Sequence, residues 1–145
     1  MGMKTSIAWC DHTFNPWLGC AKVSPGCANC YAEGGAKRSG LVEWGQGKPR
    51  RRTSVAKWRE PITWNRTMQC DCGSVPCDMS EDLDRMACPN CESLFRRPRV
   101  FCGSLMDWLD PEVPAEWLAD LLALIHATPD LDWLLLTKKI GRAHV

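Results

Sequence analysis

Three cysteines near the start of the chain have the types and spacing to hold an iron–sulfur cluster. They are Cys20, Cys27 and Cys30, in the pattern Cys-x6-Cys-x2-Cys. Three thiolates on one loop bind three irons and leave the fourth iron open for a substrate or cofactor. Residues 23–26 supply turn chemistry for wrapping a cluster, and a helix that starts after Cys30 would direct backbone N–H groups toward an anionic group. The segment therefore suits an open [4Fe–4S] site.

A closed zinc site is the competing interpretation of the same segment. Structural zinc is held by four ligands, and four thiolates are a common set. Cys10 lies ten residues before Cys20 and would be the fourth ligand. The spacing alone leaves the open cluster and the closed zinc site as alternatives.

A second group of cysteines forms two pairs, Cys70-x-Cys72 and Cys88-x2-Cys91, with fifteen residues between Cys72 and Cys88. Because the first pair is one residue tighter than the usual Cys-x2-Cys, Cys77 is an alternative ligand. Four thiolates around zinc would fold this short segment, which has too few apolar residues for a core of its own. We predict structural zinc here, and an auxiliary iron–sulfur cluster is the alternative.

The composition favours metal over disulfides. The chain has ten cysteines among 145 residues and no apolar signal segment at its start, so we expect a cytoplasmic protein, in which thiols stay reduced. No apolar run approaches the length of a membrane span, and we expect no membrane association. The net charge of +1 argues against wholesale affinity for nucleic acid, although basic residues are clustered locally.

The apolar pattern predicts a strand–helix–strand unit in the last third of the chain. Residues 114–128 form the expected helix, because apolar residues recur there at helical spacing between two prolines. Residues 131–137 read as a fully buried strand, because their apolar run does not alternate. With a strand at 99–102, this order predicts a parallel sheet. Elsewhere we expect a strand at 6–9, a helix at 31–38 and an extended segment at 61–64.

Three stretches carry a resemblance to a known family. Residues 7–33 (IAWCDHTFNPWLGCAKVSPGCANCYAE), 97–110 (RPRVFCGSLMDWLD) and 134–138 (LLLTK) are similar to a phage-associated family of unknown function with a three-cysteine motif. Its members look like radical-SAM proteins. The resemblance covers nearly all of residues 7–138 outside 69–93.

The resemblance implies cofactors and ligands. It makes Cys20, Cys27 and Cys30 the ligands of a [4Fe–4S] cluster, with S-adenosylmethionine on the open iron. Reductive cleavage of S-adenosylmethionine would then give a 5′-deoxyadenosyl radical. The spacing here departs from the commoner Cys-x3-Cys-x2-Cys of radical-SAM enzymes. In the family a threonine usually stands at the position of Cys10, which favours three ligands over four.

The expected fold is α/β, the N-terminal part of a partial (β/α) barrel of radical-SAM type. Residues 1–68 and 94–139 would form this incomplete domain, and residues 69–93 an inserted zinc-ribbon-like module. The last six residues, 140–145, are what ATC GGA AGA GCA CAC GTC encodes, a common sequencing-adapter read. We expect them to be a non-native tail on a C-terminally truncated chain. An authentic stop codon after Val145 in the resequenced source locus would contradict this.

The expected function is that of an iron–sulfur protein, a radical-SAM enzyme acting on an unknown substrate, with nucleic acid as the first candidate. Two basic patches could contact phosphates, and solvated loop charge is their other interpretation. The patches are Arg50, Arg51 and Arg52, and Arg96, Arg97 and Arg99. The alternative function is a non-catalytic zinc-binding protein that interacts with nucleic acid.

Three further residues are candidates for a role beside the cluster or on the substrate side. Asp11 and His12 come just before the cysteine loop. Asp107 follows a predicted parallel strand, at the end where α/β sheets place their ligands.

Overall fold

The computed structural model describes residues 5–76 and 86–139. The alternative ligand Cys77 and the tail at 140–145 lie outside these residues. Among the described helices, none combines the length and hydropathy that a bilayer-spanning segment needs. The elements are, in chain order, β1 (His12–Phe14), β2 (Trp17–Leu18), a 3-10 turn η1 (Pro25–Cys27), α1 (Tyr31–Ser39), β3 (Arg51–Arg52), α2 (Val55–Trp64), β4 (Thr67–Cys70), β5 (Gly73–Pro76), β6 (Arg99–Cys102), α3 (Ala115–Ala127) and β7 (Asp132–Leu135).

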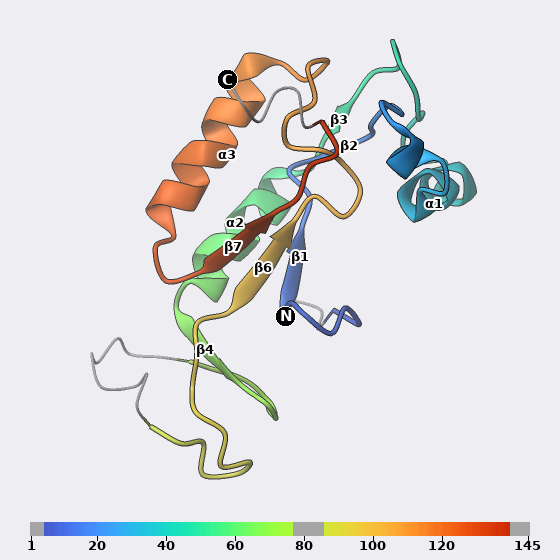
Figure 1. Ribbon diagram of the computed structural model, residues 1–145. Coiled ribbons are helices and arrows are strands. Elements are labelled where there is room, and N and C mark those ends of the chain that lie inside the picture. Colours follow the sequence, from blue (N-terminus) through green and yellow to red (C-terminus); the bar gives the residue numbers. More distant parts are fainter. Residues whose placement is uncertain (1–4, 77–85, 140–145) are drawn as a thin grey trace.

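Strands β1, β6 and β7 form a parallel sheet, as the strand–helix–strand pattern predicted. They lie in the order β1-β6-β7, which is also their order in the chain. His12 pairs with Val100 at the β1–β6 border, and Val100 pairs with Trp133 at the β6–β7 border. Figure 1 shows these strands side by side, with the β4–β5 hairpin beyond their amino ends and helix α1 beyond their carboxyl ends.

One face of this sheet is covered by α2 and α3. Because side chains alternate along a strand, His12 and Phe14 lie on the same face. His12 stacks on Trp64 of α2, and the Phe14 ring meets Trp58 of α2 edge-on. The main buried cluster joins this face to both helices and consists of Phe14, Trp17, Trp64, Val100, Cys102, Met106, Leu121, Leu124 and Leu131. On the opposite face Phe101 contacts Trp9.

The helices predicted at 31–38 and 114–128 are confirmed as α1 and α3. Helix α1 ends at Gly40, whose left-handed conformation (φ 65°) is one that glycine adopts without strain. Pro114 stands at the N-cap of α3.

Two predicted elements are wrong. The strand expected at 6–9 is β1 (His12–Phe14) instead, because pairing with β6 starts only where the Asp11 N–H bonds to the Arg99 carbonyl at 2.9 Å. The extended segment expected at 61–64 is the end of helix α2, which contains Pro61. Tertiary packing outweighs the usual cost of an internal proline, because Pro61 and Trp64 are both buried against the core.

The strand expected at 131–137 is shorter and less buried than predicted. β7 spans Asp132–Leu135 and its apolar side chains are only half-buried. In the described part of the chain it pairs with β6 alone, as an edge strand.

The core predicts a large effect at one position of α3 and a small one beside it. Leu121 is fully buried and Leu122 is 48% exposed. We expect Leu121→Ala to lower the free energy of unfolding by about 2–5 kcal/mol, because it leaves a cavity. Leu122→Ala, the matched control on the same helix, should change it by less than about 1 kcal/mol. Urea denaturation followed by circular dichroism measures both, and equal losses would contradict this packing.

Candidate metal centres

The four cysteines that the sequence grouped as two pairs come together in space. The sulfur atoms of Cys70, Cys72, Cys88 and Cys91 all lie within 4.8 Å of one another. The Sγ of Cys72 is 3.3 Å from that of Cys70 and 3.6 Å from that of Cys88. This four-cysteine site could hold a metal ion.

Two turns build the four-cysteine site. The β4–β5 hairpin carries Cys70 at the end of β4 and Cys72 in its turn. The second turn is closed by two backbone hydrogen bonds of 2.8 Å, from Cys88 N–H to the Ser93 carbonyl and from Glu92 N–H to the Cys88 carbonyl. Two of the four cysteines, Cys70 and Cys88, belong to a small buried cluster with Met68 and Phe95, and Cys91 packs against this cluster. The sulfurs thus make up much of the apolar interior of this part of the chain.

The crowded thiols perturb one another's pKa values. Hydrogen bonds from Ser93 lower the pKa of Cys91 to about 6. Hydrogen bonds with Cys70 and then with Cys88 raise the pKa of Cys72 to about 12. A bound cation would replace these shared protons, and so metal binding here releases protons.

The first cysteine group lines a single open cavity of about 710 Å³. Its walls include Cys20, Cys27 and Cys30 and the segments that follow β6 and β7. The cavity therefore lies at the carboxyl ends of the parallel strands, where α/β sheets bind ligands. Its volume is in the range of about 300–1,000 Å³ that is usual for small-molecule sites.

The loop that carries these thiols holds them in different environments. Backbone hydrogen bonds, first from Val23 and then from Ser24, lower the pKa of Cys27. Burial raises the pKa of Cys20, and the positive charge of Lys139 is the strongest opposing influence. Cys30 is the residue directly before α1. Cys27 therefore ionises more readily than Cys20.

Contacts from the end of β6 hold the cysteine loop in place. Gly19 N–H donates to the Leu105 carbonyl at 3.1 Å. The Asn15 amide donates to Ser104 Oγ at 2.9 Å and accepts from the Leu105 N–H at 2.8 Å. The Tyr31 hydroxyl donates to the Ser104 carbonyl at 2.9 Å. The approach to Cys20 and the start of α1 are therefore fixed to the same turn.

Asp107 lines the cavity, as its place after a parallel strand predicted, and its carboxylate binds neighbouring segments of its own chain. It accepts from the Thr137 hydroxyl at 2.7 Å and from the Lys138 N–H at 2.9 Å. It also accepts from the Leu109 N–H at 2.9 Å. Asp107 thus joins the ends of β6 and β7 across the floor of the cavity.

A family model described as "Protein of unknown function (DUF5131)" matches residues 4–145. The chain belongs to the DUF5131 family. No curated protein and no solved structure matches it.

In this DUF5131 chain Asp11 and His12 lie away from that cavity. Asp11 accepts two hydrogen bonds from Arg96, at 2.5 and 2.8 Å, and a third from the Arg99 N–H. Burial alone would raise the pKa of Asp11, but Arg96 and Arg99 hold it below its usual value. His12 is buried with its ring stacked on Trp64 at 4.3 Å, and burial lowers its pKa, which favours the neutral form.

Arg50 of the DUF5131 chain forms a buried network that the sequence did not reveal. Its Nε donates to Asp110 at 2.6 Å and its Nη2 to Glu112 at 2.7 Å, and Nη1 donates to the carbonyls of Gly45 and Lys48. The Arg50 and Asp110 side chains are only 1% and 0% exposed. Both interpretations of this patch, phosphate contact and solvated loop charge, are therefore wrong for Arg50, because its guanidinium is enclosed by its own chain.

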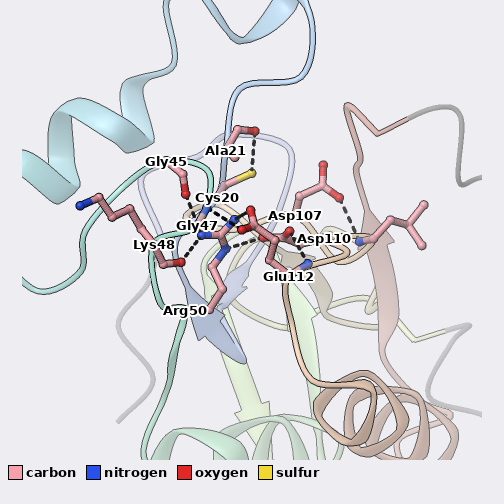
Figure 2. A network of polar contacts seen from close by, with 10 residues as sticks. Cys20, Ala21, Gly45, Gly47, Lys48, Arg50, Asp107, Asp110 and Glu112 are labelled. Carbon is pink, nitrogen blue, oxygen red and sulfur yellow. Dashed lines mark hydrogen bonds and ion pairs between the residues drawn. The ribbon is translucent and has the colours of Figure 1, made fainter.

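The network lies directly beneath the first cysteine group, and Figure 2 shows Cys20 beside it. Gly19, with φ +107°, brings the backbone so close that a Cβ would lie 3.0 Å from the Arg50 side chain. Gly45 N–H also donates to the Cys20 carbonyl at 2.9 Å. Arg50 thus supports the backbone from which Cys20 extends.

The two remaining described cysteines, Cys10 and Cys102, belong to neither group. Cys10, the alternative zinc ligand, is buried and lines a second cavity of about 350 Å³, together with Cys70. Cys102 is fully buried, and burial raises its pKa to about 12. Cys102 is therefore an unreactive core thiol.

Proposed function

We propose that this protein is an iron–sulfur enzyme of the radical-SAM type, with nucleic acid as its first candidate substrate. In this proposal Cys20, Cys27 and Cys30 hold a [4Fe–4S] cluster, and the four-cysteine site holds structural zinc. The resemblance to phage-associated radical-SAM-like proteins belongs to the same proposal. One observation carries it, namely that the three thiols share an open cavity at the carboxyl ends of the parallel strands.

The residues of the first group fit such a cluster. In a cubane each thiolate binds its own iron, so the three sulfurs need not be as close together as four ligands of a single ion. Within the described ranges, the tight four-sulfur arrangement is found at the other site. Three thiols also leave one iron without a protein ligand, and the cavity gives room beside it.

The sheet supports a partial (β/α) barrel. In such barrels neighbouring parallel strands follow one another in the chain and the helices lie outside. Here the order β1-β6-β7 is sequential, and α2 and α3 cover one face. The Phe101 side chain, on the other face, lines the cavity, as the inner face of a barrel wall would.

When bound, the cluster and S-adenosylmethionine would supply one-electron chemistry. The chain's own residues position them. Asn15 and Tyr31 fix the loop, and Asp107 joins the strand ends beneath the cavity. Trp9 and Phe101, whose rings are in contact, form an apolar part of the cavity wall.

Sulfur spacing favours zinc over an auxiliary cluster at the four-cysteine site. A tetrahedral ion with Zn–S bonds of about 2.3 Å places its sulfurs about 3.8 Å apart. Two of the observed separations are 3.3 and 3.6 Å and all of them are within 4.8 Å, which is close to that value.

The same site favours a second candidate function, a non-catalytic zinc protein that binds nucleic acid. Such a protein needs no iron. Arg97 is exposed and Arg99, which shares a cavity with Cys70, is partly exposed, which suits contact with phosphates. The two candidates differ in the metal bound by the first group.

Metal analysis after anaerobic purification tests the proposal. We expect iron and sulfide together with about one zinc ion per chain. Cys27→Ala should lose most of the iron and keep the zinc, whereas Cys91→Ala should lose zinc and keep iron. A colourless protein with about two zinc ions per chain would favour the non-catalytic function and defeat the radical-SAM proposal.

A further inference from the structure

Lys139 is a buried lysine whose ammonium group has no acidic partner within residues 5–76 and 86–139. The residue is 7% exposed and lines the cavity of the first cysteine group. Its backbone N–H donates to the Thr137 hydroxyl at 2.9 Å. A positive charge on a largely buried residue is costly without a nearby counter-charge, and so a lysine in this position on the cavity wall points to an anion that completes the site.

A chain of contacts sets the position of Lys139. Asp107 accepts from the Thr137 hydroxyl and from the Lys138 N–H, and Thr137 in turn accepts from the Lys139 N–H. The Lys138 ammonium donates to the Gly26 carbonyl at 2.7 Å, between Cys20 and Cys30 in the cysteine loop. The end of β7 is thus tied to the cysteine loop, and Lys139 follows directly.

The other charged groups of the cavity are already satisfied. Lys22 pairs with Glu33 at 3.0 Å, and Lys138 binds Gly26. The Asp107 carboxylate is occupied by Thr137 and by backbone N–H groups. Within residues 5–76 and 86–139, Lys139 is therefore the lysine of this wall whose ammonium group has no counter-charge, and its positive charge acts on Cys20.

We propose that Lys139 is the counter-charge of the cluster that Cys20, Cys27 and Cys30 hold, and that it secures the cluster and favours its reduced form. The inference rests on the proposed function. Thiolate ligands make such a site anionic, and reduction adds one more negative charge. In a half-buried site the attraction between that charge and a nearby ammonium is screened less than in water. The net charge around a cluster is one of the factors that set its potential.

Three variants separate charge from packing. Lys139→Met keeps most of the apolar length and removes the charge, and Lys139→Arg keeps the charge. Lys57→Met is the matched control, because Lys57 is an exposed lysine of α2 that pairs with Glu60. Each protein is purified anaerobically, its iron and sulfide are measured, and the cluster is titrated with dithionite while its electron paramagnetic resonance signal is followed.

We expect Lys139→Met to lower the equilibrium constant for reduction roughly tenfold, which is about 59 mV for one electron. Its iron content should also fall. Lys139→Arg and Lys57→Met should stay within about twofold of the parent protein, equivalent to about 18 mV. If Lys139→Met binds too little iron to titrate, retention of iron by Lys139→Arg supports the proposal, and equal loss in both variants overturns it.

The failures of the two proposals are distinguishable. A parent protein without iron defeats the radical-SAM proposal itself. A parent protein with iron whose potential and iron content are unchanged in Lys139→Met overturns only the role of Lys139.

Discussion

Replacing Asp110 with alanine should lower the free energy of unfolding by about 3–5 kcal/mol, because it leaves the Arg50 guanidinium buried without its main counter-charge. The Arg50–Asp110 pair is 2.6 Å apart and both side chains are almost fully enclosed. Folded domains are typically stable by about 5–15 kcal/mol, and so this loss is a large fraction of the total. Urea denaturation of both proteins gives the difference.

A surface pair on the same protein serves as the control. Arg52 and Asp120 lie 2.9 Å apart, but their side chains are 34% and 54% exposed. Asp120→Ala should therefore cost less than about 1 kcal/mol. In the double variant Arg50→Met/Asp110→Leu no unpaired charge remains, and much of the stability should return. Equal effects of Asp110→Ala and Asp120→Ala would show that the buried network contributes little.

Asp110→Ala should also weaken the cluster binding proposed for the first cysteine group. Arg50 donates to the Gly45 carbonyl at 3.0 Å, and the Gly45 N–H donates to the Cys20 carbonyl. Loss of Asp110 frees Arg50 to move, and we expect iron retention to fall together with stability.

Local patterns in the sequence were sufficient for much of this fold. The helix α3 has apolar residues at helical spacing between Pro114 and Pro129, and each of these signals acts within a few residues. The parallel sheet followed from the order of elements around it. The four-cysteine site was also predictable, because metal ligands on two turns have a characteristic spacing.

The failures come from contacts between distant parts of the chain. Nothing local distinguishes Arg50 from Arg51, yet one is enclosed by Asp110 and Glu112 and the other is exposed. From local sequence alone, Pro61 predicts the end of a helix. The helix continues through it because Pro61 is buried against the core. A carboxylate sixty residues away in sequence cannot be assigned to an arginine by pattern alone.

The cavity of the first cysteine group contains one residue whose place was predictable from the sequence and one whose place was not. The position of Asp107 at a strand end was predictable from topology, since strand ends of a parallel sheet share one edge. Lys139 has no motif around it, and its importance follows only from its burial and from the absence of an acid near it in the described part of the chain.

Removal of the zinc proposed for the four-cysteine site should unfold that site. The surrounding core is small, with Met68 and Phe95 as its largest buried members. Structural zinc contributes about 10–16 kcal/mol of apparent binding energy in comparable sites. We therefore expect Cys88→Ser, or treatment with a zinc chelator, to make residues 69–76 and 86–93 sensitive to protease, which mass spectrometry of the fragments would map.

Cys20→Ser is the control for that experiment, since Cys20 is a half-buried thiol of the other group, whereas Cys88 is buried in the four-cysteine site. It should keep its zinc and its resistance at 69–76 and 86–93. Unchanged zinc content in Cys88→Ser would refute the assignment. The effect should also reach the sheet, because Gln69 and Arg96 exchange backbone hydrogen bonds and Arg96 holds Asp11 at the start of β1. Zinc would then stabilise the pairing of β1 with β6 from a distance, and loss of zinc should lower the melting temperature of the whole protein.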